Sequence, residues 1–104
     1  MTRDILKLED LHRSTFDPYL EQKFVIHLGP TERLEVELVQ ISERKSPNTE
    51  SFALLFLGPF DKVLSQKIYR MEHAEMGAFE LFLVPVMVPS DRGIHYEALF
   101  NRLV

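Results

Sequence analysis

Most of the chain alternates between apolar and polar residues with a period of two, which is typical of half-buried β-strands. In the clearest case, Leu34, Val36 and Leu38 alternate with charged residues. The adjacent apolar pair Leu38-Val39 interrupts the alternation, and a β-bulge there would let both halves of the strand keep an inward face. The pattern predicts antiparallel strands over residues 23–28, 33–41, 52–57, 67–73, 78–88 and 94–100.

Two of these segments, Phe52–Leu57 and Ala78–Val88, carry apolar residues on both faces. Such strands have to be covered on both sides, and a closed barrel also removes their exposed edges. Pro85 has no N–H group to donate, so it belongs at a strand edge or at a bulge. We therefore predict a mainly β fold, a small antiparallel β-barrel or barrel-like sandwich of about six strands with a short N-terminal helical segment.

The residues before the first strand have a helical pattern. Leu8 and Leu11 have the spacing of a short amphipathic helix. Asp17-Pro18 is typical of a helix N-cap followed by proline at the first helical position. Tyr19 and Leu20 would then turn inward, and the segment would cover an open end or face of the sheet.

The polar stretch Glu43–Glu50 contains a proline and no large apolar residue. It predicts a solvated loop, and the alternative is a plain hairpin connection. With 104 residues, the chain has the length of one domain. We expect this domain to consist of a helical segment over residues 1–22 and a barrel over residues 23–104.

Composition and charge exclude several classes of protein. The chain has no cysteine, which rules out disulfides and thiolate metal sites. A net charge of −4 disfavours nucleic-acid binding. The N-terminus lacks the apolar region of a signal peptide, and the longest mainly apolar run, Ala78–Pro89, is shorter than the roughly 20 residues of a membrane helix. We therefore expect a cytoplasmic protein with no nucleic-acid or membrane partner.

Several stretches together resemble a bacterial family of small proteins known only as a domain of unknown function. They are Leu8–Leu11, Phe24, Phe52-x-Leu54-Leu55-Phe56-x-Gly58-Pro59, Ile68–His73 with Gly77, Leu81–Val86, and Tyr96-Glu97-Ala98-x-Phe100-Asn101. The resemblance implies no catalytic residues. It implies an accessory or assembly role beside phage-tail-collar-like proteins. One departure is Glu21-Gln22, which stands where the resemblance leads us to expect a glycine before the first strand.

Candidate chemistry is sparse. Glu72, His73 and Glu97 are polar residues in the matched stretches that packing does not demand, so they form a candidate polar site. Glu72 and His73 are neighbours on a predicted strand and point to opposite faces, so a cross-strand pair of His73 with Glu80 or Glu97 is the better arrangement. His27, His73 and His95 lie on different predicted strands, and the alternatives are a three-histidine zinc site or unrelated structural histidines.

The excess of apolar residues gives the main functional hypothesis. If the helical segment does not cover the second face of the apolar strands, part of that face remains as an interface. Its candidate residues are Phe52, Phe56, Phe82, Val84 and Pro85. We predict a non-enzymatic interaction or assembly module, with a protein partner or a second copy and with no metal or cofactor. The alternatives are a small-ligand-binding barrel and, third, an enzyme whose site the sequence does not place.

Overall fold

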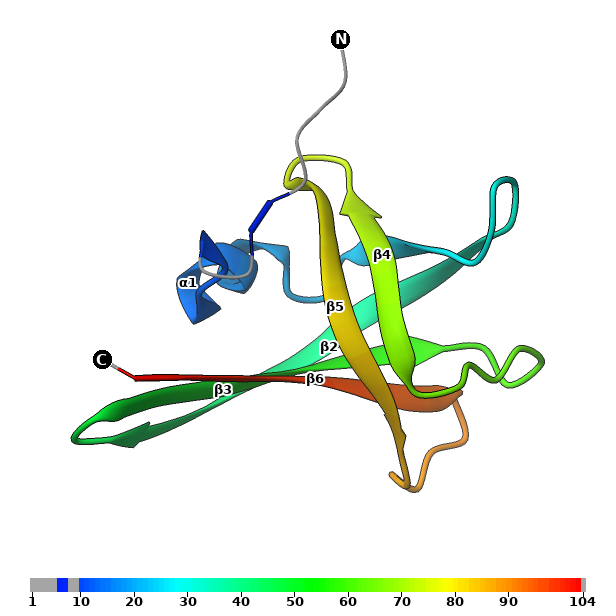
Figure 1. Cartoon of the computed structure of the whole chain (residues 1–104). Coiled ribbons are helices and arrows are strands. Elements are labelled where there is room, and N and C mark those ends of the chain that lie inside the picture. The colour runs from blue at the N-terminus through cyan, green and yellow to red at the C-terminus, as the bar shows by residue number, and fades with distance from the viewer. Residues whose placement is uncertain (1–5, 8–9, 104) are drawn as a thin grey trace, which may run out of the picture.

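Six antiparallel strands close into a ring in the order β1-β2-β3-β6-β5-β4, with the N-terminal helical segment beside it (Figure 1). The computed structural model describes residues 6–7 and 10–103. The predicted fold is confirmed, although several strands are longer than their sequence patterns. Their bounds are β1 Lys23–His27, β2 Arg33–Ser46, β3 Thr49–Gly58, β4 Lys67–His73, β5 Gly77–Val86 and β6 Ile94–Leu103.

Strand β2 takes part in two walls of the ring. It pairs with β1 over residues 33–37 and with β3 over residues 37–46. The register shifts between Leu38 and Gln40, so the predicted bulge is confirmed at this point. A bulge increases the local bend and twist of a strand. It therefore lets one strand turn from the wall shared with β1 to the wall shared with β3.

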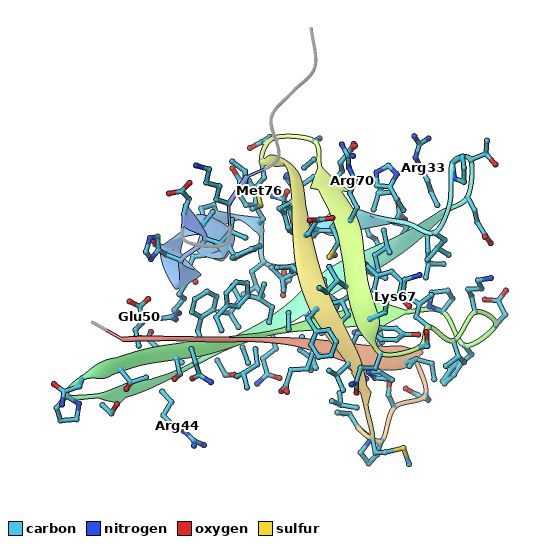
Figure 2. All side chains as sticks on the ribbon, viewed as in Figure 1. Arg33, Arg44, Glu50, Lys67, Arg70 and Met76 are labelled. Atoms are coloured by element: carbon cyan, nitrogen blue, oxygen red, sulfur yellow. The ribbon has the colours of Figure 1, made fainter. Side chains whose placement is uncertain are left out.

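Beyond the ring, β2, β3 and β6 continue as a three-stranded extension, which we call the arm (β2 residues 40–46, β3 residues 49–55 and β6 residues 97–103). The solvated loop predicted over 43–50 is wrong, because strand pairing runs to Ser46–Thr49 and only residues 47 and 48 form the turn. The polar residues there satisfy a period of two and alternate between faces. Arg44 and Glu50 accordingly project from opposite faces of the arm (Figure 2).

The helical segment consists of α1 Arg13–Phe16 and the 3₁₀ turn η2 Asp17–Tyr19. Phe16 is fully buried, and its ring lies 5.8 Å from that of Phe79 on β5 and 6.1 Å from that of Phe100 on β6. Strands β5 and β6 pair only over Val84–Val86 with His95–Glu97. Phe16 therefore fills the space where these two strands diverge, which closes one end of the barrel.

Two details of this segment differ from the prediction. Asp17 is not the N-cap, because it follows α1 directly and begins η2, whose N-cap is Phe16. Leu20 is 42% exposed, whereas Tyr19 is half-buried as expected. Leu11 is buried, and Leu8 lies outside the described residues.

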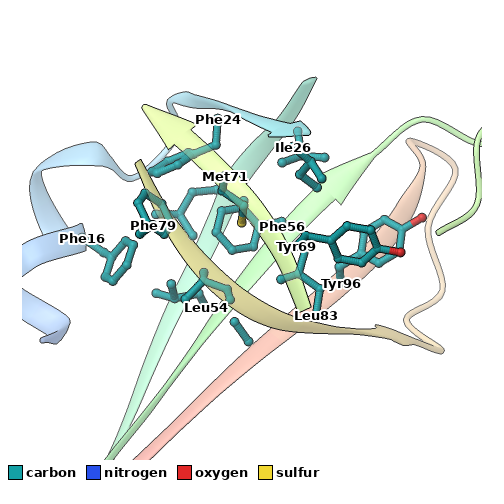
Figure 3. Close-up of a cluster of buried hydrophobic side chains, with 14 of the residues drawn as sticks. Phe16, Phe24, Ile26, Leu54, Phe56, Tyr69, Met71, Phe79, Leu83 and Tyr96 are labelled. Carbon is teal, nitrogen blue, oxygen red and sulfur yellow. The ribbon is translucent and has the colours of Figure 1, made fainter. Parts of the chain in front are cut away.

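Aromatic and aliphatic side chains occupy the barrel from end to end (Figure 3). The hydroxyl group of Tyr96 accepts a hydrogen bond from the backbone N–H of the buried Leu64 at 2.9 Å, which fixes the loop that covers the end opposite Phe16. Because aromatic and aliphatic side chains fill the interior, the structure does not support the alternative of a ligand pocket along the barrel axis. The fully buried side chains between the two ends include those of Phe24, Ile26, Leu54, Phe56, Met71 and Phe79.

Candidate interaction surface

His73 is turned into the barrel end, where it is 6% exposed. Its Nδ1 accepts hydrogen bonds from the backbone N–H groups of Glu75 at 3.0 Å and Met76 at 3.4 Å. The ring proton therefore resides on Nε2, which donates to Oε1 of Gln22 at 2.8 Å. Burial lowers the pKa of His73, and the nearby Glu75 carboxylate opposes this shift. All these contacts are with neighbours that the fold positions, so His73 has a structural role.

Glu72 points outward from the same strand. Its Oε1 lies 3.2 Å from Nε2 of His27 on the paired strand β1. This arrangement follows from strand geometry, because consecutive residues face opposite sides of the sheet. The expected pair of His73 with Glu80 or Glu97 is therefore wrong, because His73 faces the interior and binds Gln22 instead.

Glu97 lies on the outer face of β6, opposite Leu55 on β3 and Val84 on β5. The structure therefore does not bring the candidate polar residues into one site, since each lies on a different wall or face. The three histidines are likewise apart: His73 is inside, His27 pairs with Glu72, and His95 lies on β6 opposite Leu57. Among the described residues, no group of three side chains could hold a metal ion.

The candidate interface residues fall into two groups. Phe52 and Phe56 are 2% and 0% exposed, which corrects their placement in an interface, because every second residue of β3 from Phe52 faces the barrel interior. Phe82 is 49% exposed on the outer face of β5. Val84 is half-buried and Pro85 is exposed.

Pro85 lies where β5 is paired with only one neighbouring strand, which agrees with the predicted edge position. Pairing between β4 and β5 ends at Lys67 and Leu83, so at Pro85 strand β5 has only β6 as a neighbour. The missing N–H group therefore removes no bond from a central strand.

The sequence analysis missed Ile68, which lies directly opposite Phe82 on β4 and is 60% exposed. The alternation of residues along β4 could have revealed it. Tyr69, Met71 and His73 all face inward, so Ile68 has to face outward. We call Ile68, Phe82 and Val84 the β4–β5 patch, whereas Pro85 is paired with the inward-facing Tyr96 and belongs to the other face of β5. The helical segment does not lie over it, because Phe16 packs on the inward-facing rings instead.

Two concave features lie elsewhere on the surface. A groove of about 360 Å³ runs over the outer face of the arm, where Ser42, Arg44, Ala53, Glu97 and Leu99 are among its lining residues. A smaller, mainly apolar pocket of about 230 Å³ lies between Phe60 and the segment 86–95. No helix in the described part of the chain has the length and apolar character needed to cross a membrane.

The comparisons with known proteins identify the family of this chain. No curated protein and no solved structure matches the chain. A family described as "Domain of unknown function (DUF6916)" matches residues 11–100, which include the helical segment and nearly all of the six strands. The matched region covers most of the 104 residues, and the chain belongs to this family.

Proposed function

We propose that this protein is a non-enzymatic binding module that docks a protein partner on the β4–β5 patch. The observation that carries the proposal is the cross-strand pair of Ile68 and Phe82, two large apolar side chains that remain about half exposed or more at 60% and 49%. The exposed parts of these side chains keep apolar area in contact with water, and covering that area releases about 25 cal/mol per Å². A partner that covers the pair gains this free energy.

A pair of charged residues borders the patch on one side, as at the rim of a protein interface. Arg70 and Glu80 are directly opposite one another one step along the same two strands, and both are exposed. An apolar centre with a polar rim supports binding to a folded protein surface.

The arrangement of polar residues supports a role without catalysis. The histidine–carboxylate pair of His27 and Glu72 lies on an outer strand face, with Glu72 about half exposed. The buried His73 is fully engaged by Gln22 and by backbone N–H groups. The accessory role that the family resemblance implies makes phage-tail-collar-like proteins the first partners to test.

The test is a binding measurement between this protein and tail-collar-like proteins of the organism that encodes it, with the double variant Ile68→Ser/Phe82→Ser. We expect at least a tenfold loss of affinity with an unchanged circular dichroism spectrum, because both side chains are already exposed in the barrel. The matched control is Leu20→Ser, which removes a comparably exposed apolar side chain from the helical segment and should bind like wild type. Equal binding by wild type and the Ile68/Phe82 variant would remove this surface from consideration.

A further inference from the structure

The outer face of the arm presents nine side chains in a regular three-by-three array. Pairing between strands places these residues in rows directly opposite one another, on the face from which Arg44 projects in Figure 2. The three rows are Arg44–Ser51–Asn101, Ser42–Ala53–Leu99 and Gln40–Leu55–Glu97.

Short side chains form the floor of the groove in this array. Ser42, Ser51 and Ala53 occupy adjacent positions, while Leu99 is 63% exposed and stands above them. The resulting groove measures about 360 Å³. Large and small side chains are therefore separated on this part of the face, with the small ones on β2 and β3 and the large apolar one on β6.

The two charges of the array lie at opposite corners. Arg44 and Glu97 are separated by two rows, which is about 13–14 Å along the strands, and by two strand spacings of about 4.8 Å each. This separation is too large for an ion pair within one chain. Among the described residues, no ion pair includes either side chain.

We propose that this face binds the same face of a second copy of the chain about a two-fold axis, with the two sheets crossing at nearly a right angle. An axis at about 45° to the strands, close to the diagonal from Gln40 to Asn101, brings each Arg44 next to Glu97 of the other copy. The same operation places Leu99 over Ser51 and Leu55 over Ser42 of the other copy. Both charges are paired, and each large apolar side chain meets a small one.

Other two-fold arrangements lack this match. An axis parallel to β3 places Arg44 over Asn101 and Leu55 over Leu55, which leaves both charges unpaired. An axis across the strands places Arg44 over Gln40, with the same result. Orthogonal crossing is one of the two common ways in which sheets pack face to face. Charge and size together therefore select the diagonal axis.

The interface is small, since nine side chains per copy is well below the roughly 20–30 residues per side of a standard stable complex. We expect a weak dimer that forms at roughly micromolar to millimolar concentrations and weakens as salt screens its two ion pairs. No residue of the β4–β5 patch belongs to the array, although Val84 lies directly opposite Glu97. The dimer and the proposed partner binding are therefore distinguished by their different variants and readouts.

Sedimentation equilibrium of the full chain tests the proposal with two charge reversals. Arg44→Glu and Glu97→Arg should each weaken self-association at least tenfold, because each homodimer would then carry like charges at both contacts. A mixture of the two variants should dimerise again. In the mixed dimer the two introduced side chains, which have opposite charges, face one another at one contact, and the unchanged Arg44 and Glu97 face one another at the other. Arg70→Glu and Glu80→Arg, on the outer face of the other wall, are the controls and should dimerise like wild type.

Three outcomes would overturn the proposal. The first is a wild type that stays monomeric up to about 1 mM, well above the concentrations at which weak complexes form. The second is a wild-type dimer that neither reversal weakens. The third is a pair of weakened variants whose mixture does not recover, although circular dichroism shows that both are folded.

Discussion

His73 and Gln22 join the strand β4 to the end of the helical segment, with Nε2 of the imidazole 2.8 Å from Oε1 of the amide. The rings of Tyr19 and Phe24 lie 4.4 Å and 4.8 Å from the imidazole. On the other side of the ring, Nδ1 accepts from the backbone of the β4–β5 turn. One neutral histidine therefore connects three parts of the chain at the barrel end.

Stability should fall when His73 is protonated. Burial lowers the pKa of this group below its value of about 6.5 in the unfolded chain, with Glu75 opposing the shift. Between the two pKa values the unfolded state binds more protons than the folded state, so the free energy of unfolding decreases as the pH falls below about 6.5. The contribution of His73 is complete above this pH. A protonated Nδ1 would also face two N–H donors that it now accepts from.

Chemical denaturation of wild type and His73→Asn between about pH 5 and 8, a range that brackets the ordinary histidine pKa, measures this contribution. The side-chain oxygen of asparagine can accept where Nδ1 accepts, but it does not titrate. The difference between the two free energies of unfolding should shrink as the pH falls through about 6.5, because the other ionisable groups cancel. A difference that is independent of pH would show that His73 does not destabilise the fold on protonation.

Glu21→Gly should stabilise the protein. Glu21 is the non-glycine residue with positive φ, at 70°, in the part of the chain that the structure describes. Its backbone N–H donates to the carbonyl oxygen of Leu38 at 2.7 Å, which holds this conformation against β2. A left-handed backbone conformation costs a residue with a Cβ atom about 1–2 kcal/mol, and glycine avoids this cost. Glycine also makes the unfolded chain more flexible, which lowers the free energy of unfolding by about 0.5–1 kcal/mol and offsets part of the gain.

We expect a net gain of up to about 1 kcal/mol in the free energy of unfolding for Glu21→Gly. Glu21→Ala is the matched control, because it removes the same side chain but keeps the Cβ atom that makes the conformation costly. The two variants should therefore differ in thermal unfolding. Equal melting temperatures would show that the strain at Glu21 has no energetic consequence.

Gly93→Ala should destabilise the fold severely. A Cβ atom at this position would overlap the carbonyl oxygen of Gly58, which is part of the backbone and not able to rotate away. We expect a loss of about 1–3 kcal/mol, as for other overpacked sites. Gly29→Ala is the control, because a methyl group on that residue would have no neighbouring atom within 4 Å. Urea unfolding measures the stability of both variants, and equal midpoint concentrations of urea would contradict this expectation.

Phe16→Ala should open the barrel end that the helical segment closes. The ring is fully buried and meets the rings of Phe52, Phe79 and Phe100 at centroid distances of 5.8–6.5 Å. Removing a buried phenylalanine typically costs about 3–5 kcal/mol. Leu20→Ala, at an exposed position next to the same segment, should cost much less. Comparable losses in urea unfolding would mean that Phe16 is not the residue that anchors this segment.

The alternation of residues predicted more of the fold than of the surface. Leu34, Val36 and Leu38 indicated the strand and its bulge, because a pleated strand with one buried face leaves a direct trace in the sequence. The family resemblance led us to expect a glycine at Glu21-Gln22, and the backbone of Glu21 does adopt a positive φ, the conformation that glycine favours. Gly77, which begins β5 directly after a turn, also has a positive φ, at 94°. For Gly58 the constraint is different, since a Cβ atom there would lie 3.2 Å from the ring of Tyr96 and 3.3 Å from a methyl group of Val36.

What the sequence determined by itself is the period of two, and with it the β class, the number of strands and the inward side of most of them. Only the tertiary structure decided which strands are neighbours. Residues that pair, such as Ile68 and Phe82, lie on segments that are separated along the chain by a turn or by whole strands. The physical reason is that an outward side chain leaves the same local pattern whether it meets solvent, a neighbour or another molecule. Closure of the ring in space, and the place where Phe16 enters it, decided which apolar side chains remain outside.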